Sequence, residues 1–171
     1  MTYFKKLLGA ANGQSGFTLV ELVIYMGLLT ILIFIFTDIF TSIINNQLSS
    51  RNTSNVVADG RYIYSRFIYD VNRADTVLTP SSYGSTSASM VLVINGENYV
   101  YSVADNNLLI TTSSGTDRIN SYGSSINDVL FTKVGTSSAR DTIRMNFTVN
   151  GTITSGGISN QQKYQTTAGL R

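Results

Sequence analysis

The sequence predicts an α+β fold in which one long N-terminal helix packs on an antiparallel β domain. An uncharged apolar run extends from Leu22 to Phe36. An apolar stripe with spacings of three, four and seven residues then continues to about residue 74, which is typical of an amphipathic helix. Beyond residue 89, short runs of alternating apolar and polar residues are separated by turn residues, which is typical of strands.

The composition restricts the chemistry that the chain can perform. Its 171 residues are enough for one modest domain plus an appendage. The chain has no Cys and no His, so it has no disulfides and lacks the commonest general base and transition-metal ligand. We therefore expect no metal, no other cofactor and no enzymatic activity. A membrane-anchored enzyme would have to work with carboxylates, Ser, Tyr or Lys alone.

The net positive charge is confined to the N-terminus. Of the 12 Lys and Arg residues, Lys5 and Lys6 precede the apolar run, and the other ten balance ten Asp and Glu residues. A neutral body lacks the basic face that nucleic acid requires, so nucleic acid is an unlikely partner. Basic residues ahead of an apolar run favour a cytoplasmic N-terminus and an exported body.

The apolar run is long enough to cross a membrane. Residues 17–37 would form a helix of about 31 Å, close to the hydrocarbon thickness of a bilayer. The apolar side chains from Leu22 to Phe36 favour insertion by up to about 5 kcal/mol, whereas Glu21 opposes it by about 2.5 to 3.5 kcal/mol. We expect a single-pass protein of the plasma (inner) membrane.

Three kinds of export segment have to be compared. A secretory signal peptide has a shorter apolar core and a small-x-small cleavage site, which this chain lacks. A plain signal anchor accounts for the topology but leaves the residues GFTLVE unexplained. In the third kind, a leader is removed ahead of the apolar helix, and the helix stays on the mature protein.

The stretch Gly16–Glu21, GFTLVE, follows a basic leader and directly precedes the apolar helix. It resembles the processing motif of type IV pilins and type II secretion pseudopilins. The resemblance implies that a prepilin peptidase cuts between Gly16 and Phe17 and methylates Phe17. It also implies an inner-membrane assembly platform and other pilins as partners. The product would be a filament at the cell surface or in the periplasm.

Glu21 is the one acid in the segment that we expect to span the membrane. It lies at i+4 from Phe17, on the same helix face. In family filaments, the acid at this position is thought to meet the N-terminal amine of a neighbouring subunit. An unpaired carboxylate there would cost several kcal/mol, so the pairing would set one axial register. The alternative is a carboxylate that reaches out to the lipid headgroups, and the preceding motif favours the register role.

A single helix is expected from about Thr18 to about Ala74. Residues 1–16 would be the leader, 17–44 the membrane or filament-core half, and 45–78 an amphipathic half. The apolar stripe of the second half consists of Val56, Ile63, Phe67, Val71, Ala74 and Leu78. Gly60 weakens the helix by about 1 kcal/mol and could permit a bend, and Pro80 excludes further helix.

Residues 79–171 should form the antiparallel β domain, after a small-polar linker at 79–89. Strands are expected at 90–94, 97–103, 108–112, 129–134 and 142–149, with a loop at 113–125 and a last strand in the tail. Asn95-Gly96 and Asn150-Gly151 are hairpin signals. In the strand 142–149, Ile143, Met145, Phe147 and Val149 should point inward.

The helix sequence RYIYSRFIYDVNRADTV, followed by a β-rich body, is similar to the J-type minor pseudopilins and related minor pilins. Asp70–Ala74 and the tail Gln165–Arg171 contribute to this likeness. The mature helix has no Pro and the chain has no Cys pair, which differs from major pilins. The resemblance implies a structural subunit that initiates, caps or decorates a filament. The alternative is a pilus-associated adhesin or a DNA-uptake subunit.

Two side-chain groups on the second half of the helix could form a binding surface. Tyr62, Tyr64 and Tyr69 could stack on bases or sugars, but we expect them to pack the helix on the sheet. The three Arg residues at 61, 66 and 73 are offset by the three Asp residues at 59, 70 and 75. This balance predicts a mixed charged face, with Arg66 and Asp70 as an exposed pair.

Overall fold

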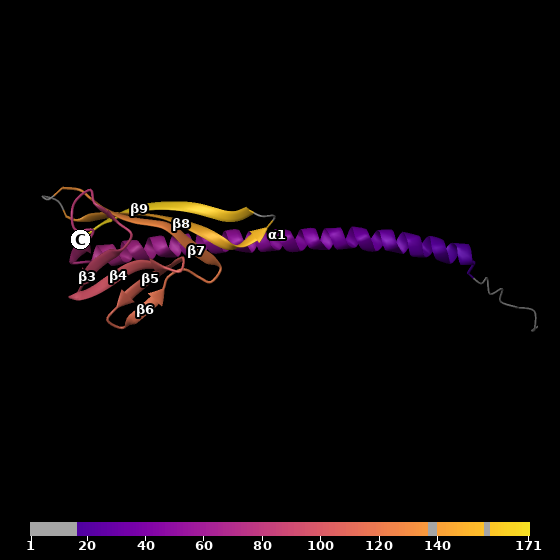
Figure 1. Cartoon of the computed structure of the whole chain (residues 1–171), viewed down its shortest axis with the longest axis horizontal. Helices are drawn as coiled ribbons and strands as arrows, with labels where there is room; N and C mark the ends of the chain where they lie inside the picture. The colour runs from indigo at the N-terminus through magenta and orange to yellow at the C-terminus, as the bar shows by residue number, and fades with distance from the viewer. Residues whose placement is uncertain (1–16, 137–139, 156–157) are drawn as a thin grey trace, which may run out of the picture. The chain divides into compact units, whose positions relative to one another are not determined.

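The computed structural model describes residues 17–136, 140–155 and 158–171. These residues contain one helix and nine strands (Figure 1). The elements are α1 (Leu19–Arg73), β1 (Thr76–Thr79), β2 (Thr86–Ser87), β3 (Met90–Ile94), β4 (Glu97–Ala104), β5 (Asn107–Thr112), β6 (Gly115–Arg118), β7 (Ser124–Val134), β8 (Thr142–Ser155) and β9 (Ile158–Gly169). The α+β class and the single long helix are confirmed.

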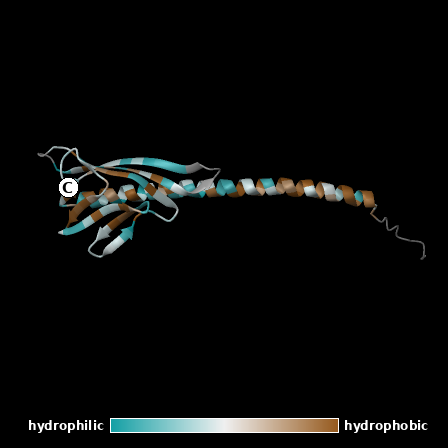
Figure 2. Cartoon of the chain, viewed as in Figure 1, coloured by the Kyte–Doolittle hydropathy of each residue, from teal (hydrophilic) through white to brown (hydrophobic). Residues whose placement is uncertain are grey.

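The chain divides into two compact units between Ile43 and Ile44, and each unit has its own character. In the first, α1 exposes nearly all of its side chains, including large apolar ones such as Leu19 and Phe34. Figure 2 shows this part of the helix dominated by hydrophobic residues. Nothing within the described chain covers it.

The second unit packs the remainder of α1 against two antiparallel sheets. One sheet has the strand order β1-β3-β4-β5-β6 and the other β2-β7-β8-β9. The helix contacts both, because the Tyr101 hydroxyl of β4 donates to Asp70 and the Tyr164 hydroxyl of β9 donates to the carbonyl oxygen of Val56. The side chain of Asn120 joins the sheets by accepting from Leu108 N and donating to Ser124 O.

The core of this unit is continuous and apolar. The stripe predicted on the helix supplies Val56, Ile63, Phe67 and Val71, each at most 2% exposed. The inward pattern predicted for residues 142–149 is also confirmed, since Ile143, Met145, Phe147 and Val149 are all buried. Phe67 lies 6.4 Å from Phe131 of β7 between ring centroids. Burial of such side chains stabilises the fold by about 1.5–3 kcal/mol each.

The predicted helix end at about Ala74 is confirmed to within one residue, but the amphipathic half predicted at 45–78 extends too far. The helix ends at Arg73, and Leu78 is an exposed residue of β1 rather than part of the helical stripe. Pro80 follows this strand, so it does not terminate the helix. The backbone N–H of Asp75 donates to Val93 O, which shows that sheet pairing begins almost directly after the helix.

Each of the predicted strands is present, and one turn between them has the predicted conformation. Asn95 and Gly96 have φ values of 53° and 81° between β3 and β4, as the predicted Asn-Gly hairpin requires. The expected loop at 113–125 is wrong, because it contains β6 and the start of β7. The expected linker at 79–89 contains the short strand β2.

The predicted hairpin at Asn150-Gly151 is also wrong. Strand β8 runs through both residues to Ser155, and Gly151 pairs with Ser124 of β7. A Cβ on Gly151 would lie 1.9 Å from the Asn52 side-chain oxygen. Gly is therefore required here by the close approach of helix and strand, and not by a turn.

Gly60 has a comparable role in the helix. A Cβ at this position would lie 2.1 Å from the ring of Tyr164. The helix is continuous through Gly60, so this glycine marks a close contact with β9 instead of the bend that the sequence suggested.

Two carboxylates predicted on an exposed mixed-charge face point into the body. Asp59 accepts from Ser121 N at 3.0 Å and from the hydroxyls of Ser121 and Ser124. Asp70 is fully buried and accepts from Tyr101 Oη at 2.6 Å and Arg66 Nε at 2.8 Å. The Arg66–Asp70 pair is thus confirmed as a contact, but its exposure is corrected.

The tyrosines of the helix were predicted to be buried against the sheet, but they are exposed. Tyr62, Tyr64 and Tyr69 are 53%, 44% and 54% exposed, so they do not pack the helix on the sheets. Phe67 and Ile63 perform that packing, because aliphatic and phenyl groups carry no hydroxyl that needs a partner.

Candidate functional site: the start of the helix

The first helical turn is fixed by Thr18. Its carbonyl accepts from Leu22 N at 3.1 Å, and its Oγ1 accepts from Glu21 N at 3.3 Å. A Thr followed three residues later by Glu is the capping-box pattern. This local sequence therefore defines where the helix begins, directly after Phe17.

Glu21, Phe17 and Tyr25 share one face of the helix because they are four residues apart. The Tyr25 hydroxyl donates to Glu21 Oε1 at 3.2 Å. The Phe17 and Tyr25 rings lie 6.0 Å apart in an edge-to-face arrangement. Glu21 is half-exposed, so one carboxylate oxygen has a partner on its own helix while the group remains open to a second molecule.

The position of Glu21 has a local electrostatic consequence. It is the acidic residue of the first turn, where the helix dipole favours negative charge by about 0.3–1 kcal/mol in exposed settings. This stabilisation and the Tyr25 hydrogen bond both hold the carboxylate at the helix start.

The residues that follow form an apolar surface with few polar groups. The Thr30 and Thr37 hydroxyls each donate to a carbonyl one turn back, Met26 O and Ile33 O, at 2.8 Å. Such hydroxyls leave no unsatisfied donor in an apolar medium. Among the described residues, α1 is the one helix long and apolar enough to cross a membrane, by length and composition. The segment predicted to span, from Leu22 to Phe36, lies inside it.

Gly16, Lys5 and Lys6 lie outside the described residues, so their predicted roles in cleavage and topology rest on the sequence. Phe17 is described and is 71% exposed. The structure therefore brings together Phe17 and Glu21, two of the predicted site residues.

The comparison with protein families gives one match. Residues 11–37 match the family model described as the prokaryotic N-terminal methylation motif, which is the class III leader of type IV pilins. The chain is type IV pilin-like. The match covers the end of the predicted leader and the first third of α1, and it does not extend into the β-rich body. No curated protein and no solved structure matches the chain.

The pilin-like assignment has three consequences. Pilins are structural proteins rather than enzymes, and the motif implies processing by a prepilin peptidase and assembly with other pilins. The motif together with the long apolar helix indicates membrane anchoring.

The sequence-based reasoning missed two residues of this site. Thr18 was treated as part of a motif and not as the helix cap, although its spacing to Glu21 gives the signal. Tyr25 was treated as one more apolar residue, although its spacing of four from Glu21 and eight from Phe17 could have identified it.

Proposed function

We propose that this pilin-like chain is a minor pilin or pseudopilin, a structural subunit of a type IV pilus, a type II secretion pseudopilus or a competence pseudopilus. Prepilin peptidase cuts between Gly16 and Phe17 and methylates Phe17. The mature chain remains in the plasma membrane through residues 17–37. Before cleavage, Lys5 and Lys6 keep the leader in the cytoplasm. It then joins a filament outside that membrane.

One observation supports this proposal above the others. Glu21 is placed in the first turn of an exposed apolar helix, on the face of Phe17, inside a segment that matches the methylation motif. A plain membrane anchor has no use for a carboxylate at this depth. A subunit that must find a neighbour in one register has such a use, because a buried acid requires a cation.

The chemistry of the pairing follows from cleavage. Removal of the leader turns the amide nitrogen of Phe17 into an amine, and a secondary N-methyl amine is still protonated and cationic. The Glu21 carboxylate of one subunit then accepts from the Phe17 ammonium of the next subunit. Tyr25 keeps one oxygen of the carboxylate hydrogen-bonded before the neighbour arrives.

The test compares two acids of the same helix in the native host. With Glu21→Ala, we expect unchanged membrane insertion and leader cleavage but at least a tenfold loss of incorporation into filaments. Asp38→Ala is the matched control, since Asp38 is an exposed acid of α1 outside the motif, and it should incorporate normally. Equal incorporation of Glu21→Ala and wild type would exclude the register role.

A further inference from the structure

The exposed side of α1 in the second unit carries a regular stripe of residues that lie outside the buried core. Ala58, Tyr62, Ser65, Tyr69 and Asn72 follow one another at spacings of four, three, four and three. We call these five residues the outer seam. Tyr62 and Tyr69 are about half-exposed, and Ala58 and Ser65 are exposed.

This spacing is that of a helix that packs against another helix. Alternation of three and four residues keeps one line of side chains facing a partner helix along its length. Large rings at 62 and 69 alternate with the small side chains of Ala58 and Ser65, so the seam offers both projections and gaps. The rings are one heptad apart, about 10.5 Å along the axis.

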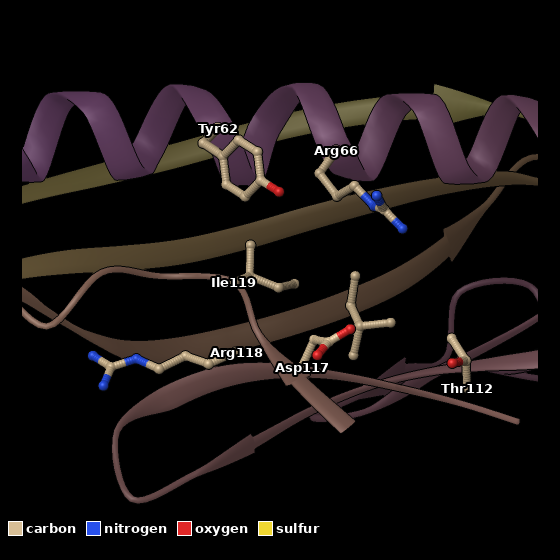
Figure 3. Close-up of a pocket in the computed structure, with 7 residues that line it drawn as sticks. Tyr62, Arg66, Thr112, Asp117, Arg118 and Ile119 are labelled. Atoms are coloured by element: carbon tan, nitrogen blue, oxygen red, sulfur yellow. The ribbon is translucent and has the colours of Figure 1, made fainter. Parts of the chain in front are cut away.

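A hollow beside the seam adds to this shape. Figure 3 shows Tyr62 and Arg66 of α1 above Ile119, with Asp117 further from the helix. The hollow has a volume of about 120 Å³ and is lined by these residues and by Ile110, Thr112 and Arg118. A side chain of a helix lying on the seam could enter it next to the Tyr62 ring.

The charges that flank the seam have one sign. In the heptad that places Tyr62 and Tyr69 at the core positions, Arg61, Arg66 and Arg73 occupy the flanking positions that select partners. Arg61 and Arg73 are exposed and make no ion pair among those found in the described residues, and Arg73 lies over the Tyr69 ring at 4.8 Å. Arg66 is paired with Asp70.

No carboxylate of α1 compensates these cations on the exposed side. Asp59 and Asp70 are the acids of residues 44–73, and both point into the body. The exposed acid Asp75 follows the helix and accepts from Asn95 N. The exposed charges that α1 itself places beside the seam are therefore all basic.

This charge pattern disfavours a second copy of the chain as the partner helix. Two identical seams would place arginines opposite arginines, which is the arrangement that helical pairs use to reject a wrong partner. Among the exposed acids of the described body, Glu97 and Asp117 lie in β4 and β6, and Asp105 lies in the turn between β4 and β5, so none of these three is on a helix.

We propose that the outer seam docks the helix of a different filament subunit whose flanking positions carry Asp or Glu. This inference rests on the proposed function, because it assumes that the chain assembles with other pilins. It makes the chain a subunit that requires a distinct, acidic neighbour at this seam, because the same seam of a second copy would present arginines.

The seam is tested by photo-cross-linking of the full chain in its native host. p-Benzoylphenylalanine replaces Tyr62 or Tyr69 in separate variants. Tyr64 is the matched control, because it is a tyrosine of the same helix, 44% exposed, and lies on another face. Mass spectrometry identifies the cross-linked molecule and the segment reached, and the same sample gives the mass of the chain's N-terminus.

We expect cross-links from positions 62 and 69, and not from 64, to an acidic helical segment of another protein that carries the methylation motif. Cross-links to a second copy, to nucleic acid or to a non-helical segment would overturn the proposal, as would equal yields at all three positions. An intact Met1 would refute the processing claim, whichever cross-links form.

A charge reversal then tests the chemistry of the partner. Arg61→Glu combined with Arg73→Glu should reduce the cross-link at position 69 by about tenfold, and Lys residues at the partner's acidic positions should restore it. Arg144→Glu combined with Lys163→Glu reverses two exposed cations on β8 and β9 and should leave the yield unchanged. Loss of the cross-link in both double variants would contradict the proposal.

Discussion

The two halves of α1 differ in where their polar side chains form hydrogen bonds. In the first unit, the polar side chains bond within their own helix, as Glu21 does with Tyr25 and Thr30 does with Met26. In the second unit, the helix acids bond to other elements: Asp59 to the segment between β6 and β7 and Asp70 to β4. Among the described residues, the polar side chains named in the first half bond only within the helix, whereas those of the second half bond to strands and loops of the body.

The apolar side chains show the same contrast. Those of the first half are exposed and those of the second half form the core. Exposed apolar surface on this scale marks a membrane or assembly surface. The second half of α1 therefore stabilises the folded body, whereas the first half has an apolar surface suited to contact with lipid or with other subunits.

The largest expected effect comes from deleting one ring in each half. Phe67→Ala should lower the free energy of unfolding by about 3–5 kcal/mol, since Phe67 is fully buried in the core. Phe34→Ala removes an exposed ring of the same helix and should leave the unfolding of the body unchanged. Denaturant unfolding of the full chain in detergent measures both. Equal destabilisation by the two variants would show that the halves do not differ in this way.

The next effect concerns the buried acid. Tyr101→Phe removes one of the two donors to Asp70 and should cost about 1–3 kcal/mol, because the carboxylate then loses a partner in the core. Tyr62→Phe removes an exposed hydroxyl and should change the stability by less than about 0.5 kcal/mol. The same unfolding assay compares them, and a loss in Tyr62→Phe as large as that in Tyr101→Phe would contradict the assignment.

Tyr101 also predicts a pH dependence. Burial, followed by the neighbouring Asp70 charge, raises the pKa of the Tyr101 hydroxyl well above its ordinary value. In the unfolded chain, a tyrosine loses its proton near pH 10, while folded Tyr101 keeps it. The stabilisation is complete below that pH and declines as the pH rises further. Unfolding measured from pH 8 to pH 11 should show a smaller decline in Tyr101→Phe than in wild type.

The same substitution at two glycines should have different effects in the two halves. Gly60→Ala places a methyl group against Tyr164, so overpacking of about 1–3 kcal/mol outweighs the helix-propensity gain of about 1 kcal/mol. At Gly27, nothing lies within 4 Å of an added Cβ, and Gly27→Ala should leave the body's unfolding unchanged. Thermal unfolding of both variants provides the measurement, and a stabilised Gly60→Ala would contradict the close contact.

The smallest effect is expected at Tyr25. Tyr25→Phe keeps the ring beside Phe17 but removes the hydrogen bond to Glu21, which contributes about 1 kcal/mol. Incorporation into filaments should fall about fivefold or less, and the substitution should have no further effect in a Glu21→Ala background. Tyr64→Phe is the control. If Tyr25→Phe also reduced incorporation in the Glu21→Ala background, Tyr25 would act independently of the carboxylate, which would contradict the prediction.

The elements that local sequence determines could be predicted. The helix from Thr18 to Ala74 and the Asn95-Gly96 hairpin follow from periodicity and turn chemistry, and both agree with the structure to within a residue or so. The Thr18 cap and the Phe17–Glu21 face were also accessible, because their spacing is local.

The features that depend on contacts between distant residues could not be predicted. Asn150-Gly151 has the sequence of a turn, but the approach of Asn52 decides its conformation. Asp59 and Asp70 look like members of an exposed charge pattern, and only the fold shows the donors that turn them inward. The basic flanks of the outer seam could not be predicted for the same reason, because they depend on Asp59 and Asp70 pointing into the body.

The N-terminal mass of the chain recovered from filaments of its native host tests the central claim most directly. The account predicts a chain that begins at Phe17 and carries one additional methyl group, with residues 1–16 absent. A filament-borne chain that still begins at Met1 would contradict it, because Glu21 would then have no neighbouring Phe17 ammonium to meet.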